Sequence, residues 1–297
     1  MMAKRPVPQG TLMLDELMSR HTSWRVGGKA DHLYIPGGWD DLSAFLRDLP
    51  HGEPVHFVGL GSNLLVRDGG MRGTVVLMHG GALSDMRMEG DKIYAEAGVT
   101  CAKLARFAAR HHRHGAEFFA GIPGTVGGAL AMNAGCHGSE TWDVVHKALT
   151  IDRHGVVHER NQVDLEIGYR HVGLPGEEWF VAAWFELPLG KASEAEQRIK
   201  SLLAKRMETQ PLSLPNAGSV FRNPEDDYAA RLIQSCGLKG YRIGDAQVSE
   251  KHANFIVNIG EATAADIEAL IAHVHDTVLR ETGVDLQREV KIIGEKQ

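Results

Sequence analysis

Apolar residues recur at helical spacing in the last third of the chain and predict three helices there. These helices cover residues 193–210, 228–236 and 264–282. The third has the clearest signal, because Thr263 and Asp266 form a capping pair at its start and Gly283 ends it. Its expected buried stripe comprises Ile267, Leu270, Ile271, Val274 and Val278.

Short apolar runs separated by glycine dominate the first two-thirds of the chain, a pattern typical of short strands. Strands are expected over residues 55–59, 64–66, 74–78, 92–96, 144–151, 156–159 and 179–187, and a last one over 284–293. One helix interrupts them, capped by Thr100 and ended by Gly115. This order does not match a doubly wound dinucleotide-binding sheet, because the Gly59-x-Gly61 turn lacks a third glycine and a following long helix.

Residues 118–136 form a stretch of nineteen residues without a charged side chain. Its length and apolarity alone would suggest a membrane span, but Pro123 and the glycines would break or weaken such a helix. The glycines are Gly121, Gly124, Gly127, Gly128 and Gly135. Because glycine lets the backbone approach a ligand closely, we expect a cradle for a phosphorylated cofactor. A tightly packed crossing of two buried segments is the alternative.

Composition narrows the class of protein. The chain has 297 residues and a formal charge of −6, so neither a broad basic field nor a nucleic-acid partner is expected. Its three cysteines, Cys101, Cys136 and Cys236, are far apart and suit a reducing compartment. The first ten residues lack an apolar signal core. The sequence therefore predicts a cytoplasmic protein without a membrane partner.

Two segments could carry chemistry. Ser219 lies in a turn rich in Asn, Gly and Pro and could donate a proton, but a serine bonded to local backbone is the simpler interpretation. Arg170 follows Tyr169 and could clamp a carboxylate, whereas a solvated arginine is the simpler interpretation.

Other polar residues leave similar alternatives open. Glu289 lies on the polar face of the last expected strand, which could line a cleft or simply face water. Lys239 lies in a loop flanked by glycines and could meet a diphosphate. The histidines of residues 110–114 are not expected to bind a metal, because arginines interrupt the run and no carboxylate or cysteine ligand lies near it.

Taken together, several motifs resemble the UDP-N-acetylenolpyruvoylglucosamine reductase family. The matching segments are residues 21–28, 59–66, 121–128, 132–135, 168–170, 215–224, 247–258 and 288–290. The resemblance extends over nearly the whole chain and favours the family's compact subgroup, because the segment between Arg170 and Pro215 is short.

The resemblance implies an α+β protein with an FAD-binding fold of the vanillyl-alcohol-oxidase type. Its two FAD-binding subdomains would cover residues 1–80 and 81–190, with a C-terminal strand, 284–297, returning to the first. Residues 191–283 would form a substrate-binding domain.

The resemblance also implies roles for individual residues. Ser219 would be the proton donor, and Arg170 and Glu289 would stabilise an enolic intermediate. The flavin would be held, without a covalent bond, by Gly59, Gly61, Ser62, Asn63, Ile122, Gly124, Gly127, Gly128 and Asn133. The substrate would contact Tyr169, Asn223, Lys239 and His252.

The implied reaction is the NADPH-dependent reduction of UDP-N-acetylglucosamine enolpyruvate to UDP-N-acetylmuramate, a step of peptidoglycan precursor synthesis. A flavin oxidase of the same superfamily is one alternative, because Cys136 and His137 border the glycine-rich stretch and could tether a flavin. A non-catalytic binding protein is another, although it would have no need of a proton donor.

Overall fold

The structure is a computed structural model that describes residues 9–297, and the chain divides into two compact units. Unit 1 contains the described residues up to Met13 together with His32–Gly59 and Thr74–Ala204. Unit 2 contains Leu14–Asp31, Leu60–Gly73 and Lys205–Gln297. Residues 1–8, part of the segment on which the expectation of no signal core rested, lie outside the described residues. The three-part division expected from the resemblance stays a prediction.

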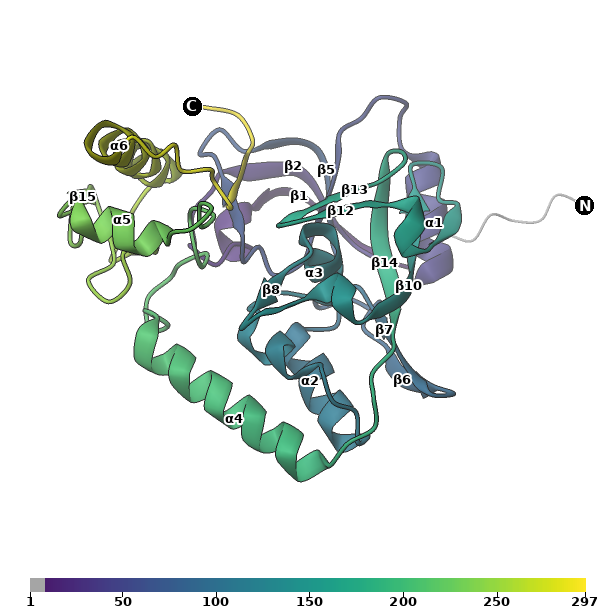
Figure 1. The fold of residues 1–297 in the computed structure, drawn as a ribbon. Helices are drawn as coiled ribbons and strands as arrows, with labels where there is room; N and C mark the ends of the chain where they lie inside the picture. Colours follow the sequence, from purple (N-terminus) through teal and green to yellow (C-terminus); the bar gives the residue numbers. More distant parts are fainter. Residues whose placement is uncertain (1–8) are drawn as a thin grey trace, which may run out of the picture. The chain divides into compact units, whose positions relative to one another are not determined.

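Strands form two larger sheets and several small ones (Figure 1). The first sheet has the order β1 (Thr11–Leu17), β2 (Lys29–Ile35), β5 (Met71–Leu77), β3 (Val55–Val58). The second has the order β11 (Val157–Arg160), β10 (Val145–Asp152), β14 (Glu178–Phe185), β7 (Lys92–Glu96), β6 (Met86–Glu89). Smaller pairings join β12 (Glu166–Gly168) to β13 (His171–Gly173), β8 (Gly135–Cys136) to β9 (Ser139–Glu140), β18 (Lys291–Ile293) to β4 (Leu64–Val66), and β15 (Arg242–Ile243), β16 (Ala246–Val248) and β17 (Ile256–Asn258).

The helices complete an α+β protein, as predicted. They are α1 (Trp39–Asp48), α2 (Cys101–Arg110), α3 (Val126–Met132), α4 (Ala192–Thr209), α5 (Ala229–Ser235) and α6 (Ala264–Thr282). The 3₁₀ turns among the described residues are η1 (Met18–Arg20), η2 (Glu117–Gly121), η3 (Thr141–Asp143) and η4 (Gln162–Asp164). None of the helices in residues 9–297 combines the length and apolarity that a membrane span requires. The uncharged stretch instead divides into η2, α3 and β8.

The core of unit 1 is built around β14, a strand buried on both faces. Phe180 and Phe185 pack with α2 and α3, whereas Val181 packs with Leu42 and Leu46 of α1. A strand covered on both sides reads as a continuous apolar run rather than an alternating one. The sequence of β14, EWFVAAWF, has this character.

The core of unit 2 lies between the helices α5 and α6 and the β15–β16–β17 sheet. The capping box of Thr263 and Asp266 is present, and the whole predicted stripe of α6 is buried. Burial of one such aliphatic side chain stabilises a fold by about 1.5–3 kcal/mol. Trp24 joins this core, and its indole donates to the carbonyl of Ile256 at 2.7 Å.

Two predicted elements were too long. The helix capped by Thr100 ends at Arg110, four residues before His114, because His112 takes a φ of 55° and leaves the helical conformation. The last strand is confined to β18, since the backbone before it bonds elsewhere: Gln287 accepts from Arg222 N–H at 2.8 Å. Residues 287–290 therefore bond to residues 220–222, which directly follow the candidate residue Ser219.

Candidate active site

The glycine-rich segment of unit 1 packs closely against neighbouring residues, as a crossing of buried segments would. A Cβ at Gly59 would lie 2.4 Å from Thr125 Oγ1, and one at Gly127 would lie 2.8 Å from Ala97 Cβ. Gly127 N–H donates to Ala97 O at 3.0 Å, which fixes the start of α3 against the end of β7. The structure therefore brings Gly59 together with the segment that contains Gly124, Gly127 and Gly128.

Gly128 differs from these two positions, because internal packing does not require glycine there. It is exposed, and a Cβ would meet only Thr125 Oγ1, at 3.9 Å. A glycine kept in open space suits a backbone that a ligand approaches. The alternative of a purely structural crossing accounts for Gly59 and Gly127 but not for Gly128. The segment thus fits a dinucleotide cofactor.

The remaining flavin-binding candidates of the first turn, Gly61, Ser62 and Asn63, belong to unit 2. Gly61 has a φ of 59°, and a Cβ there would lie 2.1 Å from His21 O, so glycine is required. Asn63 is tied to the C-terminal segment, because its Nδ2 donates to Glu289 O at 3.0 Å. Its carbonyl accepts from Lys291 N–H, also at 3.0 Å.

The sequence left open that Arg170 is a solvated arginine. The structure does not support this interpretation, because the side chain is only 14% exposed. It lies in the two-residue turn between β12 and β13 with a φ of 55°. Its Nη2 donates to Gly135 O at 2.7 Å and its Nη1 to Asn133 O at 3.3 Å. The guanidinium also stacks on Tyr169, 4.8 Å from the ring centroid.

Asn133 links Arg170 to the glycine-rich segment. It ends α3 in the left-handed conformation, with a φ of 43°, and is buried. Its Nδ2 donates to Glu140 Oε2 at 2.8 Å and to Gly168 O at 3.2 Å, and its Oδ1 accepts from Trp142 N–H. Arg170 and Asn133, nominated for different roles, therefore share one group of contacts in unit 1.

Ser219 occupies a loop of unit 2 that is held by a buried amide. Asn254 is 3% exposed; its Oδ1 accepts from Phe221 N–H at 3.0 Å and its Nδ2 donates to Phe221 O at 2.8 Å. The Asn254 carbonyl accepts from Val220 N–H at 2.9 Å. Within residues 9–297, no hydrogen bond engages the Ser219 hydroxyl, so a serine bonded to local backbone is not what the structure shows.

Glu289 lies beside this loop. Its N–H donates to Val220 O at 2.8 Å, and Phe221 pairs with Arg288 in an isolated antiparallel bridge. The residues that were expected to continue the last strand bond to the Ser219 loop instead. The structure thus brings Ser219, Glu289 and Asn63 onto neighbouring backbone segments of unit 2.

The candidate substrate contacts of unit 2 differ in character. Asn223 is exposed, and its Oδ1 accepts from Ala229 N–H at 3.1 Å at the start of α5. His252 Nδ1 is buried and has no hydrogen-bond partner among the described residues. Burial lowers the pKa of His252, and the Lys239 ammonium lowers that pKa further, so the imidazole is neutral near pH 7.

The two residues that could tether a flavin take different positions. Cys136 donates its thiol to Phe118 O at 3.1 Å. His137 is exposed and has a φ of 56°.

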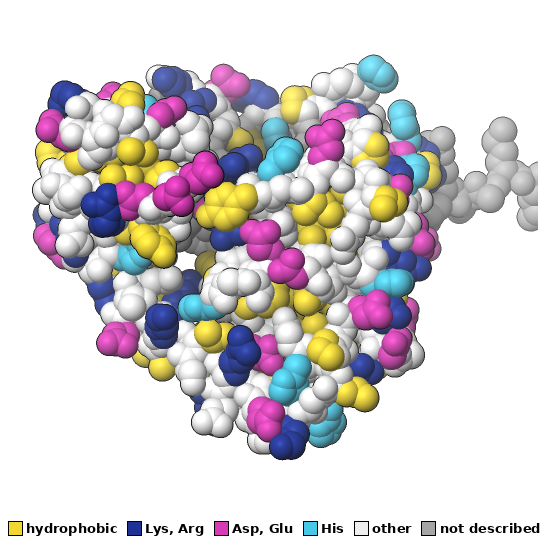
Figure 2. Space-filling view, viewed as in Figure 1, with side chains coloured by type: hydrophobic (Ala, Val, Ile, Leu, Met, Phe, Trp, Pro, Cys, Tyr) yellow, Lys and Arg dark blue, Asp and Glu magenta, His cyan; other side chains and the backbone are white. Residues whose placement is uncertain are grey.

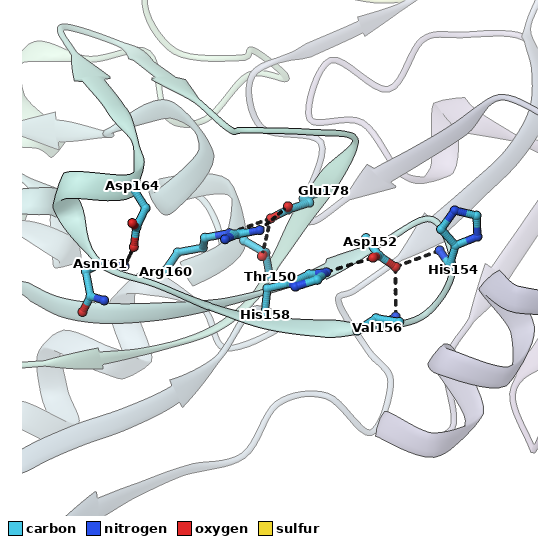
Figure 3. A network of polar contacts seen from close by, with 9 residues as sticks. All are labelled: Thr150, Asp152, His154, Val156, His158, Arg160, Asn161, Asp164 and Glu178. Atoms are coloured by element: carbon cyan, nitrogen blue, oxygen red, sulfur yellow. Dashed lines mark hydrogen bonds and ion pairs between the residues drawn. The ribbon is translucent and has the colours of Figure 1, made fainter.

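Among the described residues, surface cavities also lie away from the candidate residues. One of about 700 Å³ is lined by α1 and the β10–β11 hairpin. Figure 3 shows the polar network beside it, in which Glu178 accepts from Thr150 and Arg160, and Asp152 pairs with His158. A smaller one of about 340 Å³ is lined by α6 and the segment that leads to Glu289. On the face shown in Figure 2, acidic and basic side chains are interspersed.

Sequence reasoning missed two residues that hold the candidates in place, Glu140 and Asn254. Glu140 precedes η3 and forms a capping box with Asp143, a weak local signal that says nothing of Arg170. Asn254 lay within a matching segment, but its partner is Phe221, 33 residues away. Contacts of that separation leave no periodic pattern in a sequence.

Known proteins resemble this chain over nearly its full length. Residues 210–293 match the family model of the UDP-N-acetylenolpyruvoylglucosamine reductase C-terminal domain, and residues 30–161 match an FAD binding domain. The UDP-N-acetylenolpyruvoylglucosamine reductase of Nitrosospira multiformis is 58% identical over 96% of this chain and 89% of its own. That of Alkalilimnicola ehrlichii is 57% identical over 100% of this chain and 99% of its own.

A solved structure agrees with these relatives. The crystal structure of UDP-N-acetylenolpyruvylglucosamine reductase from Thermus caldophilus has a TM-score of 0.83 and 31% identity. The match covers 96% of this chain and 99% of that one.

Proposed function

The chain belongs to the UDP-N-acetylenolpyruvoylglucosamine reductase family, and from that premise we propose how its own residues carry out the reaction. The protein is an FAD-dependent UDP-N-acetylmuramate dehydrogenase of peptidoglycan precursor synthesis. It reduces UDP-N-acetylglucosamine enolpyruvate with NADPH as the hydride donor. Its FAD-binding part has the vanillyl-alcohol-oxidase type of fold.

The glycine-rich backbone would hold the cofactor without a covalent bond. Gly59, Gly124, Gly127 and Gly128 with Ile122 would line the diphosphate from unit 1, and the open position of Gly128 supports this assignment. Gly61, Ser62 and Asn63 would contribute from unit 2, and Asn133 from the end of α3. Glycine lets this backbone approach the cofactor closely.

Arg170 would oppose the charge that develops on the substrate carboxylate. FAD, when bound, supplies the hydride that adds to C3 of the vinyl group. A guanidinium offers two parallel donors to a carboxylate, and one that is already oriented stabilises developing charge without reorganisation. The low exposure of Arg170 and its contacts to Asn133 and Gly135 support that role.

Ser219 would deliver the proton to C2, with Glu289 next to it. The observation that carries this proposal is the hydrogen bond from Glu289 N–H to Val220 O, at 2.8 Å, which fixes Glu289 beside the serine loop. An ionised Glu289 would repel the anionic intermediate, so we assign it the protonated form in the complex. Ser219 suits a proton donor because no described residue engages its hydroxyl.

Asn223, Lys239 and His252 would contact the nucleotide-sugar part of the substrate, and Tyr169 would contact the substrate as well. The unpartnered Nδ1 of His252 supports its inclusion, since a buried polar atom without a partner is costly unless a ligand satisfies it. We also assign the protein to the cytoplasm. The free thiols of Cys101, Cys136 and Cys236 support a reducing compartment.

An anaerobic spectroscopic experiment tests the proposal. NADPH should bleach the flavin of the purified holoenzyme, and UDP-N-acetylglucosamine enolpyruvate should then restore the colour. Flavin that stays oxidised with NADPH would indicate a binding protein without this activity. Flavin that is bleached but not restored by the substrate would overturn the assigned acceptor.

A further inference from the structure

Glu140 joins two residues that the proposed function places at the reaction. Its Oε1 lies 3.4 Å from Arg170 Nη1, and its Oε2 accepts from Asn133 Nδ2 at 2.8 Å. One carboxylate therefore connects the guanidinium that would face the substrate to the buried side chain of Asn133, the residue that ends α3. We propose that Glu140 is a positioning residue, which fixes the guanidinium of Arg170 for the substrate carboxylate.

The backbone of Glu140 is itself well fixed. Glu140 pairs with Gly135 across the β8–β9 hairpin, and its N–H donates to Asp143 Oδ2 at 2.8 Å. Its side chain also accepts from the Asp143 backbone, which completes the capping box of η3. The carboxylate thus projects from a short, doubly anchored segment and can serve as a fixed reference for Arg170.

Arg170, in contrast, reaches this segment from a separate hairpin. It lies in the β12–β13 turn, and its long side chain loses rotamer entropy when it is held in one conformation. The carbonyls of Asn133 and Gly135 provide neutral anchors, and Glu140 adds a charged one. Asn133 Nδ2 also donates to Gly168 O, so the Glu140–Asn133 pair touches the start of the same turn.

Replacement of Glu140 by Gln keeps the size of the side chain but removes the carboxylate that would position Arg170. The amide has nearly the same shape but only one acceptor oxygen, so it cannot serve both Arg170 and Asn133 as the carboxylate does. A reactive group misplaced by about 1 Å can cost on the order of 10²-fold in rate. We therefore expect Glu140→Gln to slow flavin reoxidation by the enolpyruvyl substrate by about 10- to 100-fold.

The deciding experiment is a double-mutant cycle on the holoenzyme, with Glu140→Gln, Arg170→Lys and the double variant. Flavin reoxidation by substrate is followed by stopped flow. Affinity for UDP-N-acetylmuramate, whose carboxylate remains, is followed through the flavin spectrum of the oxidised enzyme. If Glu140 acts through Arg170, it should add little to either loss in the Arg170→Lys background, because interacting residues are not additive. A merely structural role would give additive losses in both readouts.

Control variants make each failure distinct. Glu159→Gln removes an exposed carboxylate of the same unit, which pairs with Lys147 at 2.7 Å, and should leave both readouts unchanged. Should Glu140→Gln fold poorly, Glu140→Asp keeps the charge, shortens the reach and should fall between the wild type and Arg170→Lys. Additive losses, or wild-type rates in Glu140→Gln with slow Arg170→Lys, overturn the role of Glu140 alone. Wild-type rates in Arg170→Lys overturn the proposed role of Arg170 and this inference with it.

Discussion

The Arg170 group of unit 1 and the Ser219 loop of unit 2 are held in place by different means. In unit 1, side chains reach across from separate hairpins, and Glu140 and Asn133 join them. In unit 2, backbone segments bond directly, as Glu289 N–H does to Val220 O at 2.8 Å, and one buried side chain, Asn254, bonds to the backbone of Phe221. The first arrangement can lose one anchor and stay folded, whereas the second ties the site residue to the fold itself.

This difference in anchoring predicts which substitutions change the reaction rate and which change the free energy of unfolding. A side-chain contact on a turn such as Arg170 can be removed while the two flanking strands remain paired. The Ser219 loop depends on Asn254, whose buried side chain bonds to both the N–H and the carbonyl of Phe221. Substitutions of the reacting side chains should thus change rates, and substitution of Asn254 should change the free energy of unfolding.

The largest expected effect is that of Ser219→Ala. Loss of a positioned acid typically costs about 10²–10⁴-fold in rate, so flavin reduced by NADPH should reoxidise slowly with substrate. The free energy of unfolding should hardly change, because no described residue bonds to the Ser219 hydroxyl. Stopped-flow spectroscopy and urea unfolding measure the two quantities. Normal substrate-driven reoxidation in this variant would remove Ser219 from the role.

Arg170→Lys should follow, with a loss of about 10²–10³-fold in the same half-reaction. Lysine keeps the charge but lacks the planar fork that reaches Asn133 O and Gly135 O together. NADPH-driven bleaching should persist and can be read in the same instrument. Arg106→Lys, a change at an exposed position of α2, is the matched control. Equal rates for the two variants would contradict the assignment.

Asn254→Ala should lower the free energy of unfolding, which the Ser219 and Arg170 substitutions should leave almost unchanged. It leaves the N–H and carbonyl of Phe221 without their buried partner, at about 1–3 kcal/mol for each unsatisfied group. Urea unfolding should show this loss, and flavin reoxidation should slow because the Ser219 loop loses its anchor. Asn254→Asp keeps the acceptor of Phe221 N–H but sets a buried carboxylate oxygen against Phe221 O, so near pH 7 it should lose at least as much stability. A stable but inactive Asn254→Ala variant would show that the comparison between the two regions is wrong.

Local signals in the sequence predicted the elements well. The strand over 92–96 and the capping box of Thr263 and Asp266 were predicted correctly, because both depend on neighbouring residues. The strand over 284–293 was predicted too long, since its first part bonds to residues 220–222, more than sixty positions earlier. The apolar residues Leu286 and Val290 are buried, but the exposed Arg288 between them breaks the alternation that a continuous strand would show.

The candidate site depended on the resemblance rather than on spacing. From the residues alone, Ser219 and Arg170 favoured a turn serine and a solvated arginine, and only the ordered motifs pointed to chemistry. Glu140 escaped notice because its contact with Arg170 joins residues 30 positions apart. No helical or strand period connects positions at that separation.

The smallest expected effect concerns the stability contributed by the contacts of His275 with Asp276 and Asp285 in unit 2. His275 Nε2 lies 2.7 Å from Asp285 Oδ1, on the segment that leads to Glu289, and Nδ1 lies 2.9 Å from Asp276 Oδ1. Hydrogen bonds to Asp276 and then Asp285 raise the pKa of His275 above its usual value. The protonated ring therefore stabilises the folded state below about pH 6.5, and that stability is lost as pH rises through the raised pKa.

For so exposed a pair the difference should be about 0.2–1 kcal/mol. Urea unfolding on either side of this window should show it in the wild type and a smaller change in Asp285→Asn. Flavin reoxidation in Asp285→Asn should match the wild type, because Glu289 is held by Val220 O and Asn63 rather than by the contact between His275 and Asp285. A large loss of rate in Asp285→Asn would mean that the C-terminal segment depends on side-chain anchors as Arg170 does, and the contrast between the two regions would fail.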